Sequence, residues 1–330
     1  MVCHWTGAGV ITVNGTPVTF ESLVIARSLE EAHSSVQFKS HVNLAAQVDA
    51  PVVVHDHDGQ IRFTGYLETH DGDRVRGYAY GARSHAVMLD KFDALGNEVF
   101  NATTIEAMVR NLAQRAGVNV ITTTSRKLAR FRMERGESYR EAIQRAAELV
   151  RVVLTDDSHG RARLFVLEQA HLPDIVLGTL REPLQVKINI AEWRRDWYCR
   201  GSRLLAAADV QEGSDISIGL QQVASQARAS RRVLSNSAAT SRASAGALVD
   251  WEARKALAST VVATASLAEW PGEPGTLVQV PELGEILVLQ SVSADIPKRV
   301  YTISLAFPDA YLASGRLQPN TLTKSERFRA

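Results

Sequence analysis

The sequence predicts a β-rich α+β protein in which two strand-rich regions flank a small α+β unit. Three observations predict this class. Alternating apolar residues separated by Asn-Gly or Asp-Gly turns fill residues 9–85, the apolar period changes from 2 to 3.6 near residue 97, and alternation returns from residue 184. We expect a first β-barrel domain at 1–96, a small α+β domain at 97–172 and a second β-barrel domain at 173–330.

The first region is expected to consist of β-hairpins. Asn14-Gly15, Asp58-Gly59 and Asp71-Gly72 each separate two alternating runs, and such pairs favour tight turns because their backbones adopt positive φ. In the strand predicted after the third turn, Tyr78 and Tyr80 share a face with two arginines, while the opposite face carries small residues. A strand face with such small side chains indicates that another part of the chain packs closely against it, as in a tight barrel.

The middle unit is expected to place two helices on a short sheet. Apolar residues at helical spacing begin after Thr103 or Thr104, which we expect to cap the first helix, and Gly117 is placed to end it. Ser138 and Glu141 have the spacing of a capping box at the start of the second helix. A turn at 156–160 and a strand at 161–167 follow.

The last region combines strands with an insertion. We expect strands at 184–204, an insertion at about 211–258, and three strands after the PGEPG turn cluster that follows Trp270. Residues 221–247 are rich in Ser, Ala and Arg, which predicts that they include a long exposed loop. A helix with Leu248, Trp251 and Lys255 on one stripe is expected to follow. An extended C-terminal arm is expected at 314–330.

Charge is balanced over the whole chain but not along it. The 330 residues carry 37 Lys and Arg against 36 Asp and Glu, which gives no strong field toward DNA or an anionic membrane. By segment, the net charge is −5 over residues 1–100, +6 over 101–203 and 0 over 204–330. Two cysteines, no window of about 18 apolar residues and no basic leader predict a protein without disulfides or a membrane span.

Catalytic chemistry has weak support in the sequence. His55 and His57, two positions apart, could offer two imidazoles to a metal in a metal-assisted hydrolase, but no third ligand is evident. Asp156, Asp157 and His159 are neighbours in a predicted turn and cannot form a nucleophile, base and orienter chain. No phosphate-binding or nucleophile motif occurs, so we predict no catalytic residue, no metal and no cofactor.

Two groups of residues are candidates for interfaces. The basic stretch from Arg126 to Arg135 could contact phosphates in a nucleic-acid-binding module, although the balanced net charge favours a solvated or subunit-facing surface. Aromatic and arginine side chains alternate in a second group, a composition found in interface hot spots. Its members, with two arginines further along the chain, are Trp193, Arg194, Arg195, Trp197, Arg231 and Arg232.

Several segments in order resemble the baseplate hub proteins of contractile-tailed, Mu-like bacteriophages, related to the late control protein D group. They include VNGTPVTFESLVIARSLEEAHSSVQFK, FTGYLETHDGDRVRGYAYGARSHAVMLD, FRMERGESYREAIQRAAELVRVVLTDDSHGRARL and LAEWPGEPGTLVQV, and they cover almost the whole chain. None of the matching segments contains a catalytic motif. The individual residues that carry the resemblance are Arg27, Ser28, Leu29, Gly65, Tyr66, Gly81, Arg83 and Ser84.

The resemblance implies a homotrimer with a central channel, in which two β-barrels per subunit form a ring of six similar barrels. Such a hub would be a structural protein that adapts a sixfold tail tube to a threefold spike. It implies as partners further copies of the chain, the spike, the tube or its initiator, the tape measure protein and the baseplate wedges. It also implies DNA in transit through the channel, a place in the virion and assembly in the host cytoplasm.

Overall fold

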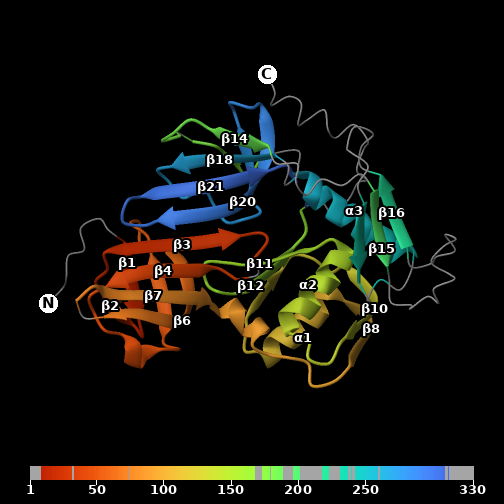
Figure 1. The fold of residues 1–330 in the computed structure, drawn as a ribbon, viewed down its shortest axis with the longest axis horizontal. Coiled ribbons are helices and arrows are strands. Elements are labelled where there is room, and N and C mark those ends of the chain that lie inside the picture. Colours follow the sequence, from red (N-terminus) through yellow and green to blue (C-terminus); the bar gives the residue numbers. More distant parts are fainter. Residues whose placement is uncertain are drawn as a thin grey trace.

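The computed structural model describes residues 9–31, 33–73, 75–167, 173–178, 180–188, 196–200, 218–222, 231–236, 239, 242–258, 261–308 and 311. The described chain is rich in strands and has three α-helices, which confirms the β-rich α+β class (Figure 1). No helix in these ranges is both long enough and apolar enough to cross a bilayer.

The described part of the first β-rich region contains seven strands. They are β1 (Val10–Val13), β2 (Thr16–Val18), β3 (Ser22–Ser28), β4 (Ser35–Ser40), β5 (Pro51–His55), β6 (Ile61–Asp73) and β7 (Gly77–Ser84), with 3-10 helices η1 (Ala45–Gln47) and η2 (His85–Asp90). Every second residue of β3 is buried, as the alternating sequence predicts. β1 and β2 pair across Asn14-Gly15, whose φ values of 52° and 74° confirm the expected tight hairpin.

One of the expected turns lies elsewhere. The sequence predicts a reversal at Asp71-Gly72, but β6 continues to Asp73, which pairs with Gly77, so the hairpin closes three residues later. Gly72 adopts φ 120° within the strand, and a Cβ on it would lie 2.3 Å from the carbonyl oxygen of Gly77. The close approach of the paired strands, rather than the turn, therefore requires this glycine.

The tyrosine face of β7 is its buried face. Tyr78 and Tyr80 are buried and the ring of Tyr80 stacks on Phe38 at 4.9 Å, whereas Ala79 on the small face is exposed. On the face with small residues, Gly81 has no room for a side chain, because a Cβ there would lie 2.3 Å from the Thr69 Oγ1 atom. The close neighbour is therefore the adjacent strand β6.

The second β-rich region continues the same sheet. Its strands are β13 (Ile175–Val176), β14 (Gln185–Ile188), β18 (Val261–Leu267), β19 (Leu277–Val280), β20 (Glu285–Asp295) and β21 (Val300–Ala306). β20 pairs with β3 in antiparallel register, which places Arg27 opposite Val292. The result is a 13-stranded sheet in the order β14-β18-β21-β20-β3-β4-β7-β6-β5-β1-β2, with β19 and β13 attached to β20.

The two β-rich regions therefore lie side by side and share one hydrophobic core, which includes residues from Ile11 to Tyr311 (Figure 1). Among the described strands the order has β14 and β2 at its ends and does not close into a barrel. The two expected barrels thus are not seen as closed units in the described chain. Their β-rich character is confirmed.

The middle unit has its own core. It contains β8 (Glu98–Thr104), α1 (Ile105–Arg115), β9 (Val120–Thr122), β10 (Lys127–Met133), α2 (Tyr139–Val150), β11 (Val153–Asp156) and β12 (Ala162–Phe165). Thr104 caps α1 by accepting a hydrogen bond from Ala107 N at 3.1 Å, and Gly117 follows the helix with φ 70°. Ser138 and Glu141 form the predicted capping box of α2. Five short strands in two sheets replace the single short sheet expected.

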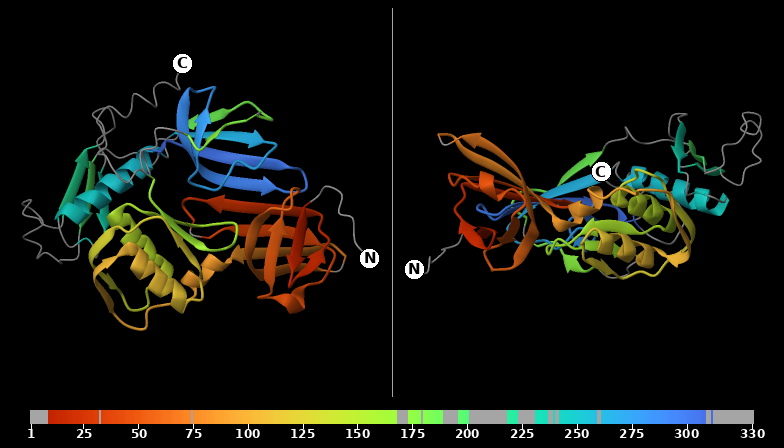
Figure 2. Two further views of the ribbon diagram at one scale, coloured as in Figure 1. Left: turned by 180° about the vertical axis from the view of Figure 1, so that it is seen from behind. Right: turned by 90° about the horizontal axis from the view of Figure 1, so that it is seen from below.

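A third, smaller cluster lies beside the middle unit. It contains β15 (Asp196–Arg200), β16 (Ile218–Gln222), β17 (Arg231–Ser235) and α3 (Arg242–Ala258). The range 221–247, expected to include a long exposed loop, contains β17, which pairs with β15, and the start of α3 at Arg242. Residues 223–230, where such a loop would fit, lie outside the described residues. Ala is a strong helix former, so the Ala-rich stretch supports the longer helix. In the side view of Figure 2, α1, α2 and α3 lie at one end of the molecule and the β6–β7 hairpin at the other.

Candidate functional site at the junction of the β-rich regions

Five side chains from four segments meet near the place where β3 runs beside β20. We call Arg27, Asp56, Arg62, Trp270 and Glu273 the junction cluster. Arg27 forms an ion pair with Glu273 and donates a hydrogen bond to the carbonyl oxygen of Arg62. The guanidinium of Arg62 lies 4.6 Å above the ring of Trp270, and its Nε atom donates to Asp56 Oδ2 at 2.5 Å. The cluster therefore joins both β-rich regions through charge-assisted contacts.

Arg27 is the most deeply buried member of the cluster. Its side chain is 1% exposed, and its partner Glu273 lies 246 residues away in sequence, in the PGEPG turn cluster. Burying an arginine without an anionic partner is strongly unfavourable. The ion pair therefore requires the PGEPG loop to place Glu273 beside Arg27. The resemblance marked Arg27, but sequence reasoning missed Glu273, because a glutamate in a Pro/Gly turn carries no sign of its distant partner.

A second polar contact joins the middle unit to the first β-rich region. Both oxygens of the Asp156 carboxylate accept hydrogen bonds from Ser34, one from its backbone N at 2.7 Å and one from its Oγ at 2.6 Å. Thr155 also donates to the carbonyl oxygen of Ser28 at 3.2 Å, and Leu29 N donates to Gln290 O at 2.8 Å. The Ser28-Leu29 motif thus lies where three parts of the chain touch.

Gly65, Gly81 and Ser84 are marked by close packing. A Cβ on Gly65 would lie 2.0 Å from the carbonyl oxygen of Arg83, so only glycine fits between β6 and β7 at this point. Ser84 is fully buried, and its N donates to the Ser34 carbonyl oxygen at 3.0 Å. These motif residues fix the shape of the sheet and none of them forms a reactive group.

Tyr66 and Arg83 make side-chain contacts beside that sheet. The ring of Tyr66 stacks on His85 at 4.2 Å, and Arg83 forms an ion pair with Glu68 that Lys91 shares at 2.9 Å. Burial by itself raises the pKa of Glu68, but the hydrogen bonds from Arg83 and Lys91 outweigh burial and lower this pKa below its ordinary value. Glu68 is therefore held as a carboxylate with two cationic neighbours.

The described chain brings parts of the aromatic and arginine candidate together. Trp197 in β15 is paired in register with Arg232 in β17, and Asp196 with Arg231. Arg232 is exposed. Trp193, Arg194 and Arg195 lie outside the described residues. The role of these residues at an interface stays a prediction.

His55 and His57 are not brought together as a metal site. His57 Nε2 lies 2.7 Å from the carbonyl oxygen of Ile296, while His55 ends β5 and its Nδ1 lies 3.1 Å from the Gly59 carbonyl oxygen. Within the described ranges there is no group of three or more His, Cys, Asp or Glu side chains able to hold a metal ion. Asp156 and Asp157 accept hydrogen bonds from separate segments instead of forming a catalytic chain.

The basic stretch forms an outer face of the middle unit. Lys127, Arg130 and Arg132 are exposed on β10, and Arg135 is exposed in the turn that follows. Arg126 is partly buried, and its Nη1 donates to the Val150 carbonyl oxygen at 3.3 Å. Four exposed cations therefore lie within nine residues of this unit, and their role as a subunit-facing or phosphate-binding surface stays a prediction.

Cys199 is a buried structural residue. Burial raises the pKa of its thiol to about 11, so the thiol stays protonated near neutral pH and is a poor nucleophile. Cys3 lies outside the described residues.

Comparison with known proteins agrees with the sequence resemblance. Residues 94–165 match a family model described as the second domain of the gp44-like baseplate hub protein. The 43 kDa tail protein of prophage MuSo2 from Shewanella oneidensis is 18% identical, with a TM-score of 0.72 over 92% of this chain and 99% of that one. No curated protein sequence matches the chain.

Two further solved structures have the same fold. The tail protein from Neisseria meningitidis MC58 is 15% identical, with a TM-score of 0.75 over 92% of this chain and 97% of that one. The prophage tail protein gp18 from Listeria monocytogenes EGD-e is 11% identical, with a TM-score of 0.56 over 98% of this chain and all of that one. The predicted likeness is confirmed: the chain is similar to phage baseplate hub proteins, whose second domain it matches at residues 94–165, and it has the fold of phage tail proteins over nearly its whole length.

Proposed function

We propose that this protein is the structural hub of a phage tail baseplate or of a related tail-like particle, and that it acts as a homotrimeric ring. One observation carries the proposal furthest: a single chain holds two β-rich regions side by side, joined by the β3–β20 pairing. Three copies would supply six such regions. A ring of that kind meets a sixfold tail tube on one face and a threefold spike on the other.

The proposed partners follow from this role. The spike would sit on the threefold face, and the tail tube or its initiator, together with the baseplate wedges, would contact the sixfold face. The tape measure protein and later the DNA would pass through the central channel of the contractile tail. The hub would have no catalytic role, would assemble in the host cytoplasm and would remain in the virion. The proposed domains are 1–96, 97–172 and 173–330, with two barrels per subunit completed in the assembly.

Contacts between copies would use exposed sheet edges and charge. β2 and β14 are the end strands of the large sheet in the described chain, and an exposed edge is best covered by a neighbour. The region of β15 and β17, with Trp193, Arg194, Arg195, Trp197, Arg231 and Arg232, is the proposed arginine and aromatic contact. The exposed cations of β10 would face acidic groups of another copy.

Light scattering tests the oligomer directly. We expect a mass three times the 36.1 kDa of one chain, and micrographs that show a ring with a central hole. The variant Arg231→Glu/Arg232→Glu should lower the trimer fraction, whereas the control Arg110→Glu, on an exposed helix turn beside Glu106, should not. A monomer at all concentrations, without rings, contradicts the proposal.

A further inference from the structure

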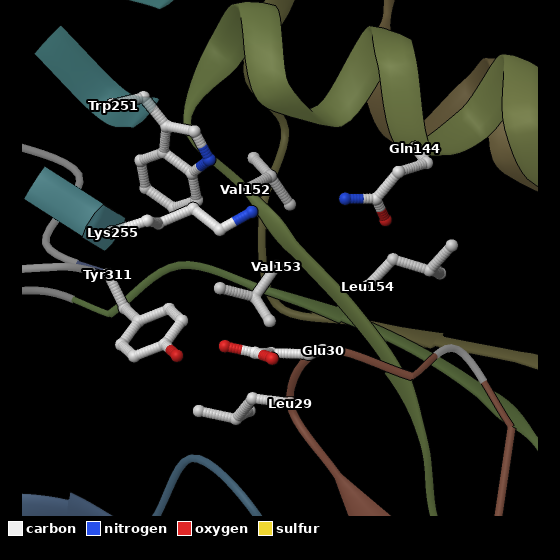
Figure 3. Close-up of a pocket in the computed structure, with 9 residues that line it drawn as sticks. All are labelled: Leu29, Glu30, Gln144, Val152, Val153, Leu154, Trp251, Lys255 and Tyr311. Atoms are coloured by element: carbon white, nitrogen blue, oxygen red, sulfur yellow. The ribbon is translucent and has the colours of Figure 1, made fainter. Parts of the chain in front are cut away.

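A cavity of about 220 Å³ lies where three parts of the chain meet (Figure 3). Its wall is contributed by the segment after β3, by α2, by β11 with the residue before it, by α3 and by Tyr311. The lining residues are Leu29, Glu30, Gln144, Val152, Val153, Leu154, Trp251, Lys255 and Tyr311. Leu29 and Tyr311 belong to the shared core of the β-rich regions, and Val152 and Leu154 belong to the core of the middle unit. The cavity therefore lies between separately packed cores.

Two donors on α3 line this cavity. Trp251 is 3% exposed, and its Nε1 atom has no hydrogen-bond partner among the described residues. The Lys255 Nζ atom lies 3.6 Å from Glu252 Oε1, which is too long for a hydrogen bond. Figure 3 shows both nitrogens on the side chains that reach from α3 into the cavity. A buried N–H without an acceptor is destabilising, so an oxygen acceptor from an occupant would stabilise this site.

The size of the cavity restricts the occupant. One water molecule needs a cavity of about 10–15 Å³, so this cavity is much larger than a site for a single water molecule. Pockets for whole drug-sized ligands measure roughly 300–1,000 Å³, so the cavity is smaller than those. It suits one or two side chains with their backbone, and Leu29, Val153 and Leu154 provide an apolar wall for them.

Position points to the segment that follows Tyr311, and Glu30 gives its basic groups a carboxylate to face. Lys255 is the one cation among the lining residues. The residues that follow Tyr311, from 312 to 330, contain four basic residues and one acidic residue, together with three leucines and one phenylalanine. Because the Tyr311 ring is itself part of the cavity wall, this segment starts at the rim of the cavity, and its tether gives it a high local concentration.

We propose that the cavity is the docking site for residues 312–330 of the same chain. A backbone carbonyl of the segment accepts a hydrogen bond from Trp251 Nε1, one of its apolar side chains fills the space beside Leu29 and Leu154, and its basic groups face Glu30. The docked segment then fastens α3 to the sheet and the middle unit. This inference does not depend on the trimer, since both partners belong to one chain.

The indole N–H signal of Trp251 in a protein labelled with ¹⁵N-tryptophan tests the docking. Trp251→Phe assigns the signal by removing it. Deleting residues 312–330 should shift the Trp251 signal and leave that of Trp270 unchanged, because Trp270 lies in the junction cluster, away from the cavity lining. A synthetic peptide of residues 312–330 added to the truncated protein should restore the original signal.

Binding of that peptide to the truncated protein measures the role of the indole donor. Trp251→Phe should weaken binding roughly three- to tenfold, the effect of one hydrogen bond. Arg110→Gln, at an exposed ion pair outside the cavity lining, should leave binding unchanged. A Trp251 signal that does not respond to the truncation overturns the proposal. A second outcome also overturns it: unlabelled full-length protein restores the Trp251 signal of the labelled, truncated protein. That result would show that the segment docks on a second copy of the chain.

Discussion

Arg27 shows how one buried charge can connect distant parts of the chain. Removing its guanidinium leaves Glu273 without its cation and the Arg62 carbonyl oxygen without a donor. We expect Arg27→Met to lower the free energy of unfolding by about 2–4 kcal/mol, below the full value for a buried pair because Glu273 is partly exposed. Urea unfolding followed by circular dichroism measures this. Arg110→Met, at an exposed pair with Glu106, should stay within about 0.5 kcal/mol, and an equal effect of the two would refute the role of burial.

Asp156 makes a comparable contact between the middle unit and the first β-rich region. Asp156→Ala leaves the buried N and Oγ of Ser34 without acceptors, so we expect a loss of about 2–3 kcal/mol in the same urea measurement. Asp295→Ala is the matched control, because Asp295 bonds only the exposed Lys298 at a hairpin. If Asp156→Ala costs no more than its control, the contact does not hold the two parts together.

Glu68 and Glu148 should give opposite pH dependences. The pKa of Glu68 is lowered on folding by Arg83 and Lys91 against the effect of burial, so its contribution to stability is present above the ordinary value of 4.5 and is lost as the pH falls through the lowered pKa. The pKa of Glu148 is raised by burial and by Glu252. Its contribution is therefore full below 4.5 and is lost as the pH rises through the raised pKa.

We accordingly expect Glu68→Gln to destabilise the protein at pH 7 and to flatten the acid side of its stability curve. Glu148→Gln should stabilise the protein at pH 7 and lose that advantage below about pH 4.5, where the wild-type side chain is also neutral. Thermal unfolding between pH 3 and 8 measures both variants. Parallel curves for the two variants would contradict the assigned causes.

At the scale of elements, two turns share one construction. Asp56 accepts hydrogen bonds through Oδ1 from the N atoms of Asp58 and Gln60, and Asp157 does the same for His159 and Arg161. Each turn also has a glycine three residues after the aspartate, with φ of 76° at Gly59 and 71° at Gly160. The sequences DHDGQ and DSHGR, first considered as chemistry, are therefore aspartate-capped hairpin turns.

The surroundings of these two glycines differ, which makes them a matched pair. A Cβ on Gly59 meets nothing within 4 Å, whereas one on Gly160 would lie 2.5 Å from the carbonyl oxygen of Thr64. Gly59→Ala should cost about 1–2 kcal/mol for the left-handed backbone alone, and Gly160→Ala about 3 kcal/mol or more because the steric overlap adds to it. Urea unfolding of both variants tests this, and equal losses would show that the Asp157 turn does not press against β6.

Local elements were predictable because their signals are local. The hairpin at Asn14-Gly15, the cap at Thr104 and the capping box at Ser138 each depend on residues within four positions, and all are present. The prediction of a chain reversal at Asp71-Gly72 was wrong. Gly72 is needed there because the two paired strands approach each other closely, and not because the chain turns. The pairing of β3 with β20 has no local signal, since it joins strands more than 250 residues apart, and the junction cluster depends on that pairing.

For the whole molecule, the uneven distribution of charge suggests how copies of the chain would find their register in the proposed trimer. The net charge is −5 over residues 1–100 and +6 over 101–203, and three of the basic groups of the second segment, Lys127, Arg130 and Arg132, are exposed on β10. Contacts within one chain use Arg27, Arg62 and Arg83 and leave these β10 cations at the surface, where a neighbouring acidic region can meet them.

Attraction between exposed charges weakens as salt shortens the screening length from about 10 Å at 0.1 M to about 3 Å at 1 M. We therefore expect the dissociation constant of the proposed trimer to be lower in 0.1 M than in 1 M salt if charge fixes the register, as we propose. Dominant apolar contacts would leave it unchanged or reverse the order. Sedimentation velocity at both salt concentrations measures the dissociation constant. Arg130→Gln/Arg132→Gln should reduce its salt dependence, while Arg110→Gln should leave it unchanged. A trimer indifferent to ionic strength would contradict the role given to charge.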